Sequence, residues 1–451
     1  MKKITSPKIF RVFFLSMVLC MVTTVSSQIP KEAFDLTNSL SDLWHKGETE
    51  KAVQSSVRLY ELYPAFLVDR IHNSLSQSIN DNAHRQNGMA YLEAIMKQNN
   101  PKINELVLPI YTWGKLYQTD DIEEIKDNLV VLKDCFTDSS FFKSRPERYC
   151  LLALKVLEQK AGIDENLKLD LLMAVMSQLE KYSFLQAVVT DRKLTEERAW
   201  NRYLLAYSNY YMFSNFDKNA MFIQRASEYS PDKYDILRKY AYSYDAFLLT
   251  GRPTRYSFQK DYFKYLHDNK NFSKALNLLT EITFGEPSDN NLNGLQHYYS
   301  EQKLEKPFKT YWTDYINTQS SKVPDITINF PGEKLDLKKK PGCWIYIDIW
   351  GTWCSPCKKE LPDLQELYVK NSENKQSNLK IYTFSYASQN LEEFMKENKY
   401  VFPVSEVDNH VTQLFNVTGY PTKILITPEG NYLTIPFNSD WRTYIKNYAL
   451  M

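Results

Sequence analysis

The 451-residue sequence is poor in glycine, carries almost no net charge and has no second long apolar run after its first 27 residues. Its 12 glycines are far below the ~7% typical of proteins, which argues for a helix-rich architecture. The 55 basic and 54 acidic residues leave a net charge of +1, so the balance indicates no surface for nucleic acid or anionic membranes. A composition of 43% hydrophobic and 24% charged residues indicates a globular protein, and this length predicts two or more domains.

The spacing expected of a structural metal site is also missing. Cys354 and Cys357 form a CxxC pair, but no second such pair occurs and the six histidines are scattered. A zinc site needs four ligands, usually from two close pairs, so the sequence predicts no metal. A purely structural disulfide across two intervening residues closes too small a loop to stabilise much. Reactivity is the better explanation of the pair.

The first 27 residues are predicted to be a signal peptide. A basic region precedes the apolar run 12–22, and Val25-Ser26-Ser27 has the small-residue form of a cleavage site. The run is shorter than the ~20 residues needed to cross a bilayer. We therefore expect an exported protein of the cell envelope or periplasm, with Gln28 as its mature N-terminus. The alternative is a lipoprotein signal ending at Cys20, which the bulky Leu19 disfavours.

Residues 28–318 are predicted to form an all-α domain built of successive helices. An alanine stands twelve residues before a proline at Ala52 and Pro64, and again at Ala275 and Pro287. A looser copy ends at Pro231. The pattern resembles tetratricopeptide repeats, in which a small residue lets two helices pack and a proline ends the second. We expect a partly tetratricopeptide-like helical domain that recruits a protein partner.

Two features of this region have two interpretations each. Tyrosine-rich segments at 202–211 and 239–244 either line a ligand groove or, as we favour, fill the repeat core with their hydroxyls at its rim. Cys135 and Cys150 flank a polar segment. In an oxidising compartment they would form a disulfide closing a ~15-residue loop, worth ~3 kcal/mol, and otherwise they are two buried thiols.

Residues 319–325 are predicted to be a polar linker, followed by an α/β domain over 326–451. The apolar run Trp344–Trp350 predicts a buried strand, and leucines at helical spacing predict a helix over Lys358–Lys370. The cysteine pair therefore lies where a strand ends and a helix begins. Cys343 precedes the strand and is interpreted as a packed spectator rather than a third redox residue.

This placement predicts thiol–disulfide exchange. Free N–H groups and the helix dipole favour the thiolate of a cysteine at a helix N-terminus. A two-unit drop in thiol pKa needs ~2.7 kcal/mol, of which the dipole supplies ~0.3–1, so N–H···S hydrogen bonds must supply most of the rest. We expect an exposed Cys354 that attacks and a more buried Cys357 that resolves the mixed disulfide.

The motifs of the last 130 or so residues resemble the thioredoxin fold, and more narrowly the TlpA-like and ResA-like envelope thiol–disulfide oxidoreductases. The resemblance rests on Trp353-Cys-Ser-Pro-Cys357, on Glu360-Leu-Pro362 and on the segment Val417–Gly430, and it covers roughly Ser321 to Met451. It implies a redox-active disulfide with no other cofactor, a protein disulfide as substrate and a membrane-bound electron donor.

The resemblance also implies roles for residues around the pair. Asp348 matches the buried aspartate of thioredoxin, implying a proton acceptor for Cys357, and Glu360 matches the acid that tunes the cysteines of ResA-like proteins. Both acids would raise the pKa of the attacking thiol. Trp353 is expected to shield the sulfur. Tyr420-Pro421 is the expected cis-proline site, whose backbone meets an extended substrate.

Three functions compete at this point. The first is an exported reductase of protein disulfides, which the resemblance favours. The second is a disulfide oxidase or isomerase of the same fold, which the dipeptide Ser355-Pro356 does not exclude. The third is a helical-repeat scaffold in which the redox pair is incidental, and an exposed, reactive Cys354 would argue against it.

Overall fold

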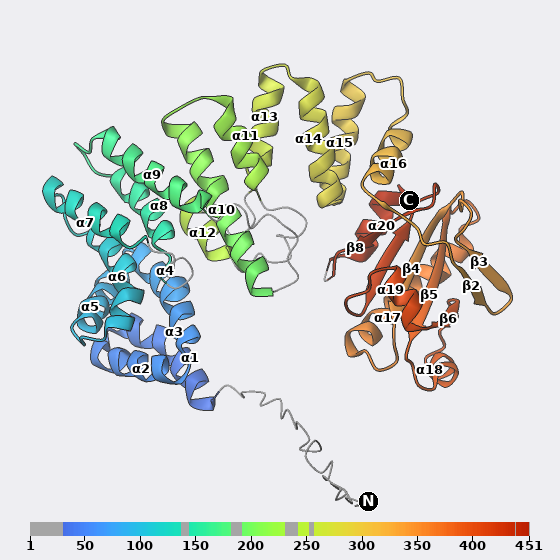
Figure 1. Cartoon of the computed structure of the whole chain (residues 1–451), viewed down its shortest axis with the longest axis horizontal. Helices are drawn as coiled ribbons and strands as arrows, with labels where there is room; N and C mark the ends of the chain where they lie inside the picture. The colour runs from blue at the N-terminus through green and yellow to red at the C-terminus, as the bar shows by residue number, and fades with distance from the viewer. Residues whose placement is uncertain are drawn as a thin grey trace, which may run out of the picture. The chain divides into compact units, whose positions relative to one another are not determined.

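The computed structural model describes residues 30–136, 144–181, 192–230, 242–251, 257–437 and 439–450 (Figure 1). The predicted signal peptide, its cleavage site and Cys20 lie outside these residues. The chain forms two compact units, one of Met1–Lys181 with Phe247–Gly251 and one of Tyr182–Ala246 with Arg252–Met451. We call them the N-terminal and C-terminal units. Along the described part of the chain, every helix is too short or too polar to cross a membrane.

The N-terminal unit is helical. Its elements are α1 (Lys31–Lys46), α2 (Thr49–Leu62), α3 (Pro64–Asp69), the π-helical turn η1 (Arg70–Leu75), α4 (Ser76–Asn80), α5 (Arg85–Met96), α6 (Pro101–Lys115), α7 (Ile122–Asp134), α8 (Pro146–Leu157) and α9 (Glu165–Glu180). Gly47 ends α1 in a left-handed conformation that glycine adopts without strain, and the Glu48 N–H closes the turn on the Leu43 carbonyl at 3.0 Å. This turn folds α2 back against α1, where Ala52 is fully buried.

Helices also make up the first half of the C-terminal unit. They are α10 (Arg192–Asn215), α11 (Ala220–Tyr229), α13 (Gln259–Asp268), α14 (Phe272–Gly285), α15 (Asp289–Glu301) and α16 (Phe308–Thr318), while α12 (Ser243–Thr250) has residues in both units. The helices pair in sequence, α10 with α11 and α13 with α14. Ala275, the small residue of one predicted repeat, is fully buried, and so is Ala226, five residues before the Pro231 of the looser copy. The assignment to tetratricopeptide repeats stays a prediction.

The predicted tyrosine-rich segments contribute to the helical core. Tyr203, Tyr207 and Tyr211 of α10 are each at most 6% exposed, and Tyr203 stacks on Tyr242 with ring centroids 5.0 Å apart. This burial favours a role in core packing for these tyrosines, rather than a role in lining a ligand groove. Residues 239–241 of the second segment lie outside the described part of the chain.

The rest of the C-terminal unit is a six-stranded mixed sheet in the order β1-β8-β7-β4-β5-β6, with a separate β2–β3 hairpin. The strands are β1 (Ser321–Lys322), β2 (Thr327–Phe330), β3 (Glu333–Asp336), β4 (Trp344–Trp350), β5 (Leu379–Tyr386), β6 (Val404–Val407), β7 (Thr422–Ile426) and β8 (Asn431–Ile435). The helices are α17 (Ser355–Glu373), α18 (Leu391–Glu397), α19 (Asn409–Leu414) and α20 (Trp441–Ala449). β4 runs parallel to β5 and antiparallel to β7.

Both faces of β4 are covered, which explains its uninterrupted apolar run. Ile345, Ile347 and Ile349 join the core beneath the β2–β3 hairpin. The alternate residues Tyr346 and Trp350 join the core formed by α17, α18, α20 and helices α13–α16. The predicted α/β domain and the predicted strand are thus both present, and the C-terminal part of the chain has a thioredoxin-like fold.

The C-terminal helix α20 binds the unit's helical part through hydrogen bonds as well as through this core. The Trp312 indole N–H donates to the Asn447 carbonyl at 3.0 Å, and the Asn447 side chain donates to the Pro287 carbonyl at 2.6 Å. Lys446 pairs with Asp289 at 2.7 Å. Ser321–Lys322, inside the predicted linker 319–325, form β1 and pair with β8. That segment is therefore part of the sheet, while the predicted domain bounds stay a prediction.

Candidate active site

β4 leads directly to the cysteine pair, and Cys354 is the residue that caps α17. Cys354 has an extended backbone, and the Cys357 N–H points at its Sγ at 3.2 Å. The helix begins at Ser355, three residues earlier than predicted, with Pro356 in the first turn, where a missing N–H costs nothing. This contact is an N–H···S hydrogen bond of the kind that we expect, from the sequence, to supply most of the stabilisation of the thiolate.

The pair is oxidised to a disulfide, and both cysteines are buried. Cys354 is 4% exposed and Cys357 2%. The predicted exposure of Cys354 is therefore wrong for this oxidised form, because its sulfur is bonded to the buried Cys357 and faces the first turn of α17. The exposed residue beside the pair is Trp353, at 53%.

Trp353 belongs to a cluster of aromatic side chains next to the pair. Its indole N–H donates to the Tyr386 carbonyl at 3.0 Å, its ring meets the Tyr420 ring edge-on at 5.1 Å, and Tyr386 stacks on Tyr420 at 5.5 Å. Gly351 permits this arrangement, since a Cβ there would lie 2.5 Å from the Trp353 Nε1 and 2.8 Å from the Tyr386 carbonyl. No motif in the sequence points to Tyr386, which ends β5 and comes to the pair only through the β4–β5 pairing.

The Tyr420–Pro421 peptide bond is cis. It lies just before β7, and the Thr422 hydroxyl donates to the Gly419 carbonyl at 2.6 Å across the bend. The ring contact between Tyr420 and Trp353 places this loop beside the cysteine pair. Recognition of an extended substrate by the backbone of this loop stays a prediction.

A buried lysine links the two predicted carboxylates. Lys423 of β7 lies directly opposite Asp348 of β4, with its Nζ 3.8 Å from the Asp348 Oδ1, and it also pairs closely with the Glu360 Oε2. Lys423 and Asp348 side chains are 8% and 3% exposed, whereas Glu360 is 37% exposed. Three charged groups thus share one site against α17, with two negative charges and one positive.

Burial raises the pKa of Asp348 to about 6, since a carboxylate loses its hydration there. The Lys423 ammonium opposes this increase and the Glu360 carboxylate adds to it. The Asp348 Oδ1 has no hydrogen-bond partner among the described residues. A carboxyl group that titrates near neutral pH in a buried site is suited to accepting and returning a proton.

Asp348→Asn is expected to stabilise the sheet at alkaline pH. The folded-state pKa of about 6 exceeds the ordinary 3.8, so ionised Asp348 opposes folding. That cost is absent below pH ~4, grows between pH ~4 and ~6 and is complete above, reaching about 3 kcal/mol. Hydrogen exchange of β4 amides should show this gain at pH 8 and little of it at pH 4.5. The exposed Asp325→Asn is the matched control, and a gain independent of pH would contradict the assignment.

Lys423 is the main site residue that was not predicted from the sequence. Its signal was a lone lysine in the apolar strand Thr422–Ile426, two residues after Pro421. A charge in such a strand implies a buried partner, but the partner is identified only by the β4–β7 register. Neither cysteine nor aspartate spacing reveals that register.

The remaining described cysteines are thiols. The Cys135 Sγ donates to the Val131 carbonyl at 3.1 Å, and burial raises the pKa of Cys135 to about 11 and that of Cys150 well above its ordinary value. Their disulfide stays a prediction for oxidising conditions. Cys343 is half-buried just before β4. Among the residues that the structure describes, no three His, Cys, Asp or Glu side chains are arranged to hold a metal ion.

Comparison with known proteins agrees with this geometry. The AhpC/TSA family profile matches residues 320–432. The thiol-disulfide oxidoreductase ResA of Bacillus subtilis (strain 168) is 27% identical over 133 residues, which cover 29% of this chain and 74% of the relative. ResA of Oceanobacillus iheyensis is 31% identical over 116 residues, covering 24% of this chain and 59% of the relative.

Among solved structures, a thiol:disulfide interchange protein of the thioredoxin family from Chlorobium tepidum TLS matches at 20% identity. The match covers 29% of this chain and 97% of that protein, with a TM-score of 0.26. All these matches fall on less than a third of the chain. The C-terminal part of this chain is a thioredoxin-like domain related to the ResA-like and TlpA-like proteins, and the protein is a thiol–disulfide oxidoreductase.

Proposed function

We propose that this protein is an exported reductase of protein disulfides, with Cys354 as the attacking and Cys357 as the resolving cysteine. The observation that carries the proposal is the Cys354 sulfur at the N-terminus of α17, where it faces the Cys357 N–H. Export rests on the basic and apolar pattern of the first 27 residues.

The exchange proceeds in two balanced steps. In the reduced protein the Cys354 thiolate attacks one sulfur of a substrate disulfide, forming a mixed disulfide and releasing the other sulfur as a thiolate that takes up a proton. The Cys357 thiolate then attacks Cys354, which releases the second substrate thiol and regenerates the Cys354–Cys357 disulfide. Two electrons pass to the substrate, and a dithiol donor must return them to the protein.

Asp348 serves the second step in this proposal. Cys357 must lose its proton before it can attack, and Asp348, with a pKa of about 6, is a base near neutral pH. The Lys423 ammonium offsets the negative charge of the Asp348 and Glu360 carboxylates. The electron donor is proposed to be a membrane-bound dithiol protein, and the helices of the chain are proposed to recruit a protein partner.

The reduction potential of the Cys354–Cys357 pair tests the direction of electron flow. We expect the mature full-length protein, equilibrated against defined dithiothreitol or glutathione ratios, to show a potential near ~−270 mV, typical of reductases. Cys354→Ser is the control and should show no reversible two-electron couple.

A potential near ~−120 mV would overturn the reductase proposal and favour the oxidase or isomerase alternative. The absence of any reversible couple in the native protein would instead favour the helical scaffold, with its redox pair incidental. Either result leaves the thioredoxin-like fold of residues 320–432 unaffected.

A further inference from the structure

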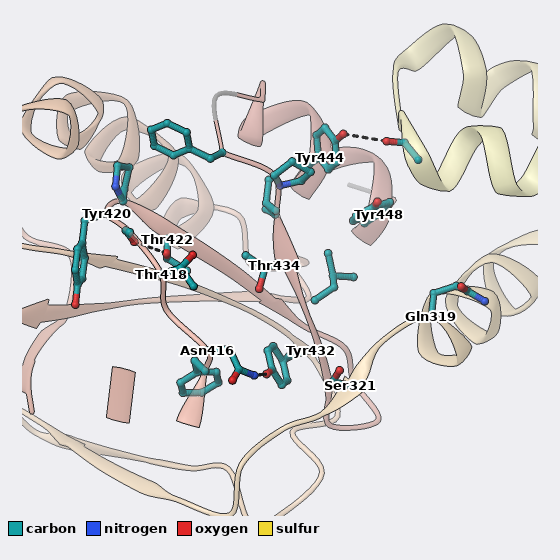
Figure 2. A pocket seen from close by; sticks show the side chains of 18 of the residues that line it. Gln319, Ser321, Asn416, Thr418, Tyr420, Thr422, Tyr432, Thr434, Tyr444 and Tyr448 are labelled. Carbon is teal, nitrogen blue, oxygen red and sulfur yellow. Dashed lines mark hydrogen bonds between the residues drawn. The ribbon is translucent and has the colours of Figure 1, made fainter. Parts of the chain in front are cut away.

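A groove in the C-terminal unit runs from the cis-proline loop along β8 to the end of α14 (Figure 2). Its volume is about 680 Å³, within the ~300–1,000 Å³ range of pockets that bind small molecules. It begins at Tyr420 and Pro421 and passes Thr434 and Phe437. The groove therefore starts at Tyr420, whose ring contacts Trp353 next to the cysteine pair.

One wall of the groove is an open strand edge. β1 pairs with β8 only at Asn431 and Tyr432, and within the described residues no strand pairs with that edge beyond Tyr432. The Asn431 carbonyl accepts from the Thr427 N–H at 2.8 Å and thus faces β7. Because backbone groups alternate along a strand, the N–H and C=O of Thr434 face the other way, into the groove. Thr434 is exposed.

The opposite wall is fixed and aromatic. The Tyr444 hydroxyl donates to the Gly285 carbonyl at 3.1 Å and the Tyr448 hydroxyl to the Phe284 carbonyl at 2.6 Å. These bonds satisfy the carbonyls at the end of α14 and hold the rings of α20 in place. Phe437, two residues after β8 and 52% exposed, adds another aromatic side chain to the lining.

The groove is also neutral, since none of its described lining residues is Asp, Glu, Lys or Arg. An occupant therefore needs no charge to match the walls, and a charged segment would lose hydration without gaining a partner. An unpaired edge beside an apolar wall suits an extended polypeptide, which adds a strand through its backbone and places alternate side chains on the wall.

We propose that this groove binds an uncharged, extended segment of the polypeptide substrate as an added strand on β8, next to the cysteine that Cys354 attacks. The inference rests on the proposed function, because continuity with Tyr420 and Pro421 places the segment beside the redox pair. It gives the helices a part in substrate binding, since α14 supplies one end of the groove.

The test uses a peptide of about ten residues, alternating valine and threonine around one cysteine held as a mixed disulfide with 2-mercaptoethanol. Thr434→Pro removes the outward N–H, and proline is tolerated at a strand edge. We expect this variant to lower kcat/KM for the peptide roughly three- to tenfold, the effect of about one lost hydrogen bond. Thr434→Val, which keeps the N–H, should stay within about twofold of the native protein.

Hydroxyethyl disulfide, too small to reach β8, serves as the second substrate, and both variants should reduce it at the native rate. Equal peptide kcat/KM for Thr434→Pro and Thr434→Val would overturn the groove proposal. The proposal would also be overturned if Thr434→Pro lowered kcat/KM for hydroxyethyl disulfide as much as it lowers kcat/KM for the peptide. A dimer of the native protein that dissociates in Thr434→Pro would assign the edge to a second copy and also overturn it.

Binding of a serine version of the peptide to the oxidised protein separates this inference from the proposed function. Fluorescence anisotropy should detect binding to the native protein and Thr434→Val, with several-fold weaker binding to Thr434→Pro. If this difference in binding is seen but the protein reduces neither disulfide, the proposed function is wrong and the peptide-binding groove is retained. If the protein reduces both disulfides but the variants bind the peptide equally well, the groove proposal is wrong and the proposed function is retained.

Discussion

Cys354→Ser is expected to lower disulfide reduction by about a thousandfold or more, because the thiolate is the nucleophile and a serine hydroxyl does not ionise near pH 7. The measurement is a single turnover in which stoichiometric reduced protein meets a peptide mixed disulfide and the released thiol is followed. The position of Cys354 as the cap of α17 gives the expectation its structural basis. The fold should survive, since a serine fits the same N-cap geometry.

Cys357→Ser should behave differently and thereby separate the two roles. Cys354 still attacks in this variant, but nothing resolves the intermediate, so a one-to-one mixed disulfide with the peptide should accumulate and be visible by intact mass. Cys343→Ser, which removes a half-buried thiol of the same domain, should leave the rate unchanged. Accumulation of the adduct in Cys354→Ser instead would reverse the assigned roles.

The position of the cysteine pair between a strand and a helix could be predicted from the sequence because its signals are local. The run Trp344–Trp350 is the strand β4, and the cysteines lie at its junction with α17. Strand and helix periodicity, with a proline in the first turn, are properties of short segments. The burial of Cys354 could not be predicted in this way, because it depends on the disulfide and on how the first turn of α17 lies against the sheet.

Features that depend on register or on distant packing were not predictable. Lys423 meets Asp348 only because β7 pairs antiparallel to β4 in one register, and a shift of one residue would turn Lys423 to the opposite face. The contact of Trp312 with Asn447 joins residues 135 positions apart. No periodicity in either segment indicates that α20 contacts the helices that precede the sheet in the sequence.

This joining of helices and sheet bears on function. Asn317 of α16 accepts hydrogen bonds from Thr427 and Asn431, at 2.6 and 3.1 Å, which anchor the turn between β7 and β8. Another of these helices, α14, accepts hydrogen bonds at its end from Tyr444 and Tyr448 of α20, which form the aromatic wall of the groove. The helical part thus contributes to the groove beside the redox pair through direct contacts within the C-terminal unit.

Lys423→Met is expected to destabilise the sheet around the redox site in a pH-dependent way. Methionine keeps the length and apolar stem of the side chain but leaves Asp348 and Glu360 without their shared cation. Removing one partner of a buried pair costs about 3–5 kcal/mol. We expect about 3 kcal/mol near pH 8, because the other affected carboxylate, Glu360, is partly exposed and screened by solvent.

The sign of the pH dependence follows from Asp348. Lys423 lowers the pKa of Asp348, so its removal raises that pKa further above about 6. A raised folded-state pKa means that stability falls as pH rises, from about 4 up to the new pKa. The loss caused by Lys423→Met should therefore be small near pH 5 and full near pH 8. Hydrogen exchange of β4 and β7 amides in the full-length protein measures it, with the exposed Lys380→Met as control.

A double variant separates charge from packing at this site. Asp348→Asn combined with Lys423→Met should recover most of the loss at pH 8, because an amide next to a methionine leaves no buried carboxylate without a cation. Lys423 also lies over the Trp441 ring, with its Nζ 5.6 Å from the ring centroid, so part of its effect could come from packing. A loss that is equal at pH 5 and pH 8, and that persists in the double variant, would assign the role of Lys423 to that packing. A recovered double variant would instead show that Lys423 acts through the charge of Asp348, the base that we propose for Cys357.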